Sequence, residues 1–160
     1  MALIESWVVA LEATTLSAGL RTSIWLYPII NTLHIIGMGM LLGAMTVLDL
    51  RLLGWRQRVP VSSLSQMVLP VAASGLLIAV SAGALLFVAR PLDYIFNGLF
   101  QIKLGLLVLA LINIWWCVNS PGWRVALEDG IVNRFVRLSA ALSIGLWLAI
   151  IFAGRMVGYR

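Results

Sequence analysis

The chain has a single histidine, His34, and it lies inside a long apolar stretch. An ionisable side chain at membrane depth is costly, so by default it marks a functional site. Counting from Ile24, where the apolar stretch begins, His34 lies ten residues in, or about 15 Å along a helix. This is close to the midplane of a hydrocarbon core about 30 Å thick. The sequence therefore predicts a site around His34.

Other polar and sulfur-bearing side chains share a helical face with this histidine. Successive spacings of three, four, seven and four residues place five side chains on one stripe: Asn31, His34, Met38, Met45 and Asp49. A helix face in contact with lipid would not carry Asn and His at this depth. We therefore expect the stripe to face the interior of a bundle or a partner.

Three kinds of chemistry suit this stripe. A haem iron takes an axial imidazole and sometimes a thioether, and a Cu(I) ion takes soft thioethers together with imidazole. A proton or a hydrogen-bond partner needs only the imidazole. The candidate cofactor-binding residues are His34, Met38 and Asn31, and the candidate metal ligands are His34, Met38 and Met45. The structural alternative is that His34 bonds Asn113 or a serine of a neighbouring helix and stabilises the bundle.

The numbers of histidines and cysteines restrict which of these cofactors the chain could bind. One histidine cannot supply both axial ligands of a bis-histidine haem within one chain, so a haem would need Met38, another sulfur, an open position or a second chain. The lone Cys117 excludes an intramolecular disulfide and a cysteine-only metal site. The sequence shows no carboxylate pair, nucleophile–base pair, phosphate loop or zinc spacing, so we do not expect the chain to be an enzyme by itself.

The composition predicts a membrane protein. The chain is 62% hydrophobic and 11% charged, with a mean hydropathy of +1.04, against roughly 25% charged residues in soluble domains. The net charge of +5 is spread over the ends of the apolar runs. This pattern predicts contact with lipid headgroups and no nucleic-acid surface.

Apolar runs bounded by charged residues predict one transmembrane domain over residues 1–160, an all-α integral membrane four-helix bundle. The expected spans are residues 24–48, 67–88, 99–118 and 138–157, each near the roughly 20 residues that a spanning helix needs. Residues 2–16 place Trp7, Val8 and Leu11 on one face. This predicts a short N-terminal amphipathic helix in the interface, in preference to a signal peptide, which would need a basic start.

The distribution of cations favours one orientation. Six arginines fall on one side of the predicted spans, and five cations fall on the other: Arg51, Arg56, Arg58, Arg124, Arg134 and Arg137 against Arg21, Arg90, Lys103, Arg155 and Arg160. The positive-inside rule places the six in the cytoplasm and both termini outside.

Small residues recur every four positions in three spans: Gly39 and Gly43; Gly75, Ala79 and Gly83; Gly145, Ala149 and Ala153. Such seams let helices approach closely in lipid. Packing within the bundle accounts for most of them, but this number of seams also predicts a homo-oligomer or a hetero-complex with other membrane subunits.

Several stretches resemble a known group of proteins. Residues 31–43 and 49–54, with 143–147 and 153–155, are similar to a family of small, uncharacterised bacterial four-helix membrane proteins. More distantly they resemble copper-resistance D-type and b-type cytochrome membrane domains. In those larger groups, histidines on the core helices hold haem or are proposed to handle copper, and His34 alone matches such a position here.

Together, the residues and the resemblance predict a protein of the bacterial inner membrane. The expected role is an accessory redox or metal- and haem-handling subunit centred on His34, with haem b or copper as the candidate cofactor. The alternatives are a copper-trafficking membrane protein and a structural subunit of a larger membrane complex.

Overall fold

The computed structural model describes the backbone of residues 2–158 and the side chains of residues 6–158. The described residues are helical and contain no strand. Four of their helices are long and apolar enough to cross a membrane: α3 (Leu26–Leu52), α4 (Val61–Ala89), α6 (Gly98–Val118) and α8 (Arg134–Val157). The chain is thus a multi-pass all-α membrane protein, as predicted. Arg160, one of the five cations counted on the outer side, lies outside the described residues, as does Tyr159.

Polar side chains cap the starts of α6 and α8, which begin before the expected apolar runs. Asn97 Oδ1 accepts hydrogen bonds from the backbone N–H groups of Leu99 and Phe100, which starts α6. Asn133 Oδ1 accepts one from Val136 N, and this cap starts α8 four residues before the expected span. Side-chain oxygens at the N-cap satisfy donors that the first helical turn leaves unpaired.

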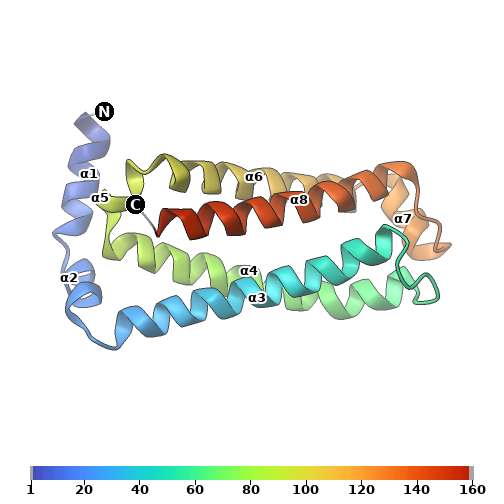
Figure 1. Cartoon of the computed structure of the whole chain (residues 1–160), viewed down its shortest axis with the longest axis horizontal. Helices are drawn as coiled ribbons and strands as arrows, with labels where there is room; N and C mark the ends of the chain where they lie inside the picture. Colours follow the sequence, from blue (N-terminus) through green and yellow to red (C-terminus); the bar gives the residue numbers. More distant parts are fainter. Residues whose placement is uncertain (1, 159–160) are drawn as a thin grey trace.

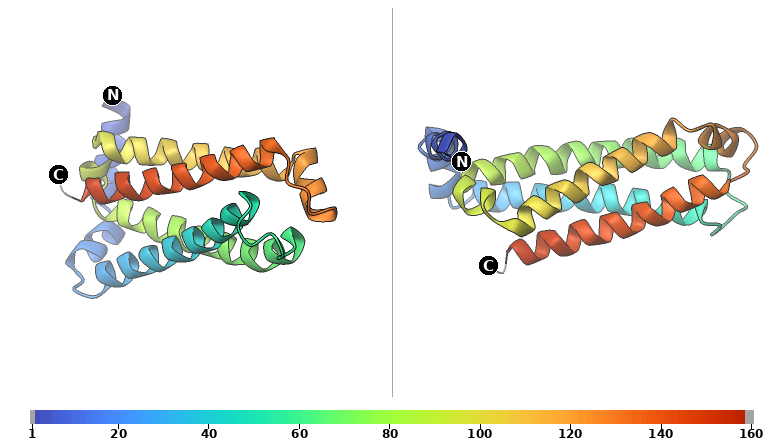
Figure 2. Two further views of the ribbon diagram at one scale, coloured as in Figure 1. Left: turned by 45° about the vertical axis from the view of Figure 1, so that its right-hand side comes forward. Right: turned by 90° about the horizontal axis from the view of Figure 1, so that it is seen from above.

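The four long helices form two antiparallel pairs that run side by side (Figure 1). Helix α3 packs along α4, α6 packs along α8, and α3 also contacts α8, which joins the pairs. Figure 2 shows the pairs diverging over part of their length. Among the described residues, α6 makes no close backbone contact with α3 or α4. The bundle is therefore loosest where α6 faces the α3–α4 pair.

Four short helices lie at the two ends of the bundle (Figure 1). Helices α1 (Ala2–Glu12), α2 (Thr15–Thr22) and α5 (Pro91–Ile95) lie at the end where α3 begins, and α7 (Pro121–Glu128) lies at the other. The single interfacial helix predicted over residues 2–16 is instead two helices. Thr14 Oγ1 accepts a hydrogen bond from Ser17 N and starts the second, and an Arg21–Glu12 ion pair links the two.

The closest helix contact is between α3 and α4, and its glycines differ from those predicted for α3. A Cβ on Gly37 would lie 2.6 Å from Ala79 N, and a Cβ on Gly75 would lie 2.6 Å from Leu41 N. By contrast, a Cβ on Gly39 or Gly43 would meet nothing within 4 Å. Gly37 therefore allows the close approach, because the face that it shares with Leu41 is the one turned toward α4.

Helix α6 contributes least to the interior. It buries only Ala110 and Cys117, while Ile102, Val108 and Ile112 are exposed. Exposed branched apolar side chains over a span of this length suit contact with lipid or with a neighbouring membrane helix.

Candidate functional site

A cavity of about 710 Å³ lies between the two helix pairs, and His34 lines it. Asn31 and Met38 line the same cavity from α3, and residues of α4, α5, α6 and α8 complete it. Binding sites for small molecules and cofactors occupy about 300–1,000 Å³. The cavity is thus large enough for a cofactor and far larger than a bare metal ion requires.

The His34 imidazole is held by the backbone of α4. Its Nδ1 lies 2.7 Å from the carbonyl oxygen of Ala79, so Nδ1–H donates and the carbonyl accepts. Among the described residues no hydrogen-bond partner is found for Nε2. The imidazole thus contacts a neighbouring helix of the bundle, as expected for this stripe. Its partner is a backbone carbonyl, whereas Asn113 bonds Ser139 instead.

This arrangement suits ligand binding by Nε2. A hydrogen bond from Nδ1–H to a carbonyl fixes the tautomer and the ring orientation, and it leaves the Nε2 lone pair available. Ligating histidines commonly carry such a bond on the other ring nitrogen. The chain therefore presents one oriented imidazole ring in the lining of a cofactor-sized cavity.

Two cations line the same cavity, and sequence reasoning placed both only as interfacial charges. Lys103 comes from α6 and Arg155 from the last turn of α8. The Lys103 ammonium lies against Gly154, where a Cβ would come within 3.3 Å of Nζ. Lys103 forms no ion pair within the part of the chain that the structure describes. One feature of the sequence could have indicated this role for Lys103, because the only lysine of the chain lies inside a predicted spanning helix.

Aromatic rings form one side of the cavity. Phe87 and Phe100 stack with their ring centroids 5.7 Å apart, and Tyr94 lies 5.3 Å from Phe100. Burial, followed by the neighbouring Tyr27, raises the pKa of Tyr94 in α5 to about 12. Both phenols line the cavity, and Tyr94 stays protonated at neutral pH, so it can donate a hydrogen bond to an oxygen of a ligand.

The structure separates the predicted residues into two groups. Asn31, His34 and Met38 share the large cavity, while Met45 lines a second, smaller cavity beside Asp49. Met45 lies eleven residues beyond His34, about 16 Å along the helix axis. The helical stripe thus contributes side chains to two separate cavities, and Met45 does not line the cavity of His34.

The positions of His34 and Met38 also restrict what they can hold together. They lie one helical turn apart on the same wall of the cavity. The two axial ligands of a haem approach the iron from opposite faces, so two neighbouring side chains of one helix do not suit that role. A small ion bound from one side could contact both.

A classical metal cluster is absent from the part of the chain that the structure describes. No group of three or more His, Cys, Asp or Glu side chains lies close enough to hold a metal ion. Comparison of the chain with protein-family models, curated proteins and solved structures found no match.

Proposed function

We propose that this protein is an accessory redox subunit of the bacterial inner membrane that holds or hands on a haem b through His34. The observation that carries the proposal is the His34 imidazole, which bonds Ala79 O through Nδ1 and has Nε2 unpartnered on a cavity of about 710 Å³. An oriented histidine on an apolar, cofactor-sized cavity is the arrangement that haem proteins use for the proximal ligand.

The other residues of the cavity fit the same group. A haem is flat and mainly apolar, and it carries two carboxylates at one edge. The aromatic side formed by Phe87 and Phe100 suits a flat conjugated ring, and Lys103 and Arg155 supply positive charge for carboxylates. When bound, the iron would supply one-electron chemistry.

Because Met38 lies on the same wall as His34, we expect His34 to be the only axial ligand from α3. The second axial position would be open or would be filled by another element or another chain. An open position suits transfer of the haem or binding of a small ligand. In this respect the proposed site differs from that of a bis-histidine cytochrome, in which both axial positions are filled.

The test is a visible spectrum of the protein purified in mild detergent, with and without added haem. We expect a Soret band whose intensity corresponds to about one haem bound per chain. His34→Ala should abolish this band, while Cys117→Ser, which changes a thiol at the other end of α6, should leave it unchanged. A wild-type protein that binds no haem, or a His34→Ala variant that binds it equally well, would refute the proposal.

Copper handling is the second candidate, and one observation favours it. His34 and Met38, one turn apart on the same wall, can both reach a single Cu(I) ion. Metal analysis after loading with Cu(I) distinguishes the candidates, because both His34→Ala and Met38→Leu should reduce bound copper. If the ligand is haem, His34→Ala should reduce the amount of bound haem, and Met38→Leu should not.

A larger membrane complex, or a second copy of the chain, would fit this accessory role. The exposed apolar surface of α6 supports contact with another membrane subunit as well as with lipid. Co-purification in mild detergent tests this part of the proposal separately. If neither haem nor copper binds and a partner chain co-purifies, a structural subunit becomes the better description.

A further inference from the structure

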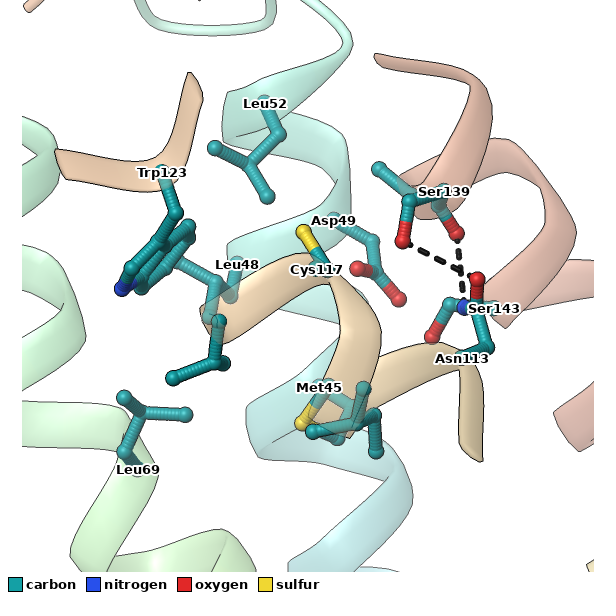
Figure 3. Close-up of a pocket in the computed structure, with 13 residues that line it drawn as sticks. Met45, Leu48, Asp49, Leu52, Leu69, Asn113, Cys117, Trp123, Ser139 and Ser143 are labelled. Carbon is teal, nitrogen blue, oxygen red and sulfur yellow. Dashed lines mark hydrogen bonds between the residues drawn. The ribbon is translucent and has the colours of Figure 1, made fainter. Parts of the chain in front are cut away.

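A second polar cluster lies at the other end of the bundle, near α7, and the proposed haem site makes no use of it. Figure 3 shows side chains from three helices meeting there: Asp49 from α3, Asn113 from α6, and Ser139 and Ser143 from α8. Asn113 Nδ2 donates to the Ser139 carbonyl, and Ser139 Oγ donates to Asn113 Oδ1, at 3.0 Å each. This reciprocal pair holds α6 against α8 and lines the same cavity as Asp49.

Asp49 is a carboxyl group that is almost fully buried, at 3% exposure. Arg51, the arginine nearest to Asp49 in sequence, does not neutralise its charge. Arg51 donates from Nε to Val59 O at 2.6 Å and from Nη2 to Gln57 O at 3.0 Å. Its guanidinium is therefore bound to backbone carbonyls of the loop after α3. Asp49 forms no salt bridge within the described part of the chain. An uncompensated carboxylate in an apolar interior is strongly unfavourable.

Two buried oxygen atoms of this cluster, Asp49 Oδ2 and Ser143 Oγ, form no hydrogen bond of ordinary geometry in the described residues, although the Ser143 hydroxyl lies near the Asp49 carboxyl group. Both side chains line a cavity of about 30 Å³. A volume of this size accommodates an occupant of about the dimensions of a water molecule. The two atoms that need a partner thus border a space that fits one small polar occupant.

We propose that Asp49, Ser143 and the Asn113–Ser139 pair form a binding site for one small monovalent cation, either Na⁺ or a proton. The site offers one negative charge, and its other oxygen donors are neutral hydroxyl and amide groups. One charge matches a monovalent cation, whereas Ca²⁺ sites use several carboxylates and carbonyls. The cation supplies the charge that no basic side chain provides.

The other groups that face Asp49 do not compete for this role. Within the described lining of the cavity, Cys117 of α6 is the one further titratable side chain. The other lining side chains are apolar or aromatic, and Trp123 of α7 is one of them. The occupied site joins α3 to α6 and α8, so binding should stabilise the contact between the two helix pairs.

The experiment measures the thermal unfolding midpoint of the intact protein in detergent over a rising NaCl series. Choline chloride keeps the ionic strength constant, and the series is run at alkaline and at acidic pH. For Na⁺, the midpoint of the wild type should rise and saturate at alkaline pH, and protons should compete at acidic pH. Asp49→Asn should abolish the response, and Asp93→Asn, at an exposed carboxylate of α5, should retain it.

Infrared spectroscopy distinguishes the proton from Na⁺. A proton held at the site gives the C=O stretching band of a protonated carboxylic acid at neutral pH, and Asp49→Asn should remove that band while Asp93→Asn should not. If Asp49→Asn fails to fold, Ser143→Ala keeps the carboxyl group. It should weaken Na⁺ binding about tenfold, as expected for loss of one bond to a charged group, or shift the carboxylic acid band. A wild type with neither a saturable Na⁺ response nor this band would overturn the proposal.

Discussion

Gly83 of α4 leaves the space that the imidazole of His34 occupies. A Cβ on Gly83 would lie 3.1 Å from His34 Cε1 and 3.3 Å from Nδ1. The same helix supplies the Ala79 carbonyl that accepts the Nδ1–H hydrogen bond. Helix α4 thus both makes room for the ring and fixes its rotation, and Nε2 is left without a hydrogen-bond partner among the described residues.

We therefore predict that Gly83→Val will displace the ring and weaken cofactor binding at least tenfold, by roughly 1.4 kcal/mol or more, without unfolding the bundle. Titration of the purified variant with haem or Cu(I) measures the effect. Gly105→Val on α6 is the matched control, because a Cβ there meets nothing within 4 Å. Equal affinities of the two variants would show that the ring position does not matter for binding.

The contact between α3 and α4 should be sensitive to a single methyl group. Gly37→Ala places a Cβ 2.6 Å from the backbone nitrogen of Ala79, so the helices must separate. We expect a loss of about 1–3 kcal/mol in the free energy of unfolding, as for other overpacked contacts. Unfolding in mixed detergent measures it. Gly43→Ala on the same helix should be neutral or stabilising by up to about 1 kcal/mol, and a Gly37→Ala variant as stable as this control would contradict the packing.

The Asn113–Ser139 pair should contribute measurably to the contact between α6 and α8. A double-mutant cycle with Asn113→Ala and Ser139→Ala isolates the interaction between the two side chains. We expect a coupling free energy of about 0.6 kcal/mol and no more than about 1.7 kcal/mol, the average and the largest value found for hydrogen bonds between membrane helices. A coupling near zero would mean that the pair only satisfies its own polar groups.

Self-association is expected to involve the first or the last span. Gly39 and Gly43 face no neighbour within the described bundle, so they remain available for contact with a second chain. Replacing both with leucine should separate the particles seen by size-exclusion chromatography at low detergent. A wild-type protein that is monomeric with no co-purifying chain would remove the basis for this prediction.

The topology can be tested with reporter fusions. The six arginines near α7 and the α3–α4 loop favour a cytoplasmic location for residues 49–66 and 119–133. Fusions after Gln57 should report the cytoplasm, and those after Asn97 and Arg160 should report the outer side. Opposite signals at Gln57 and Arg160 would invert the orientation.

Several features follow from the sequence alone, because they depend on local patterns. Long apolar runs and the cost of an unpaired imidazole in lipid are enough to predict the four helices and an inward-facing His34. Helix periodicity correctly placed Asn31, His34 and Met38 on one face. These inferences need only the 3.6-residue repeat and the chemistry of the bilayer.

The tertiary structure decided which side chains meet across helices. The sequence placed Lys103 and Arg155 at the interfaces, and only the gap between α6 and the α3–α4 pair brings them onto the cavity of His34. Likewise, Asn113, Ser139 and Ser143 were isolated polar residues until α6 and α8 packed beside Asp49. The periodicity of one helix defines its faces, but the neighbour of each face depends on rotation and crossing between helices, which small residues such as Gly37 and Gly75 set through close packing.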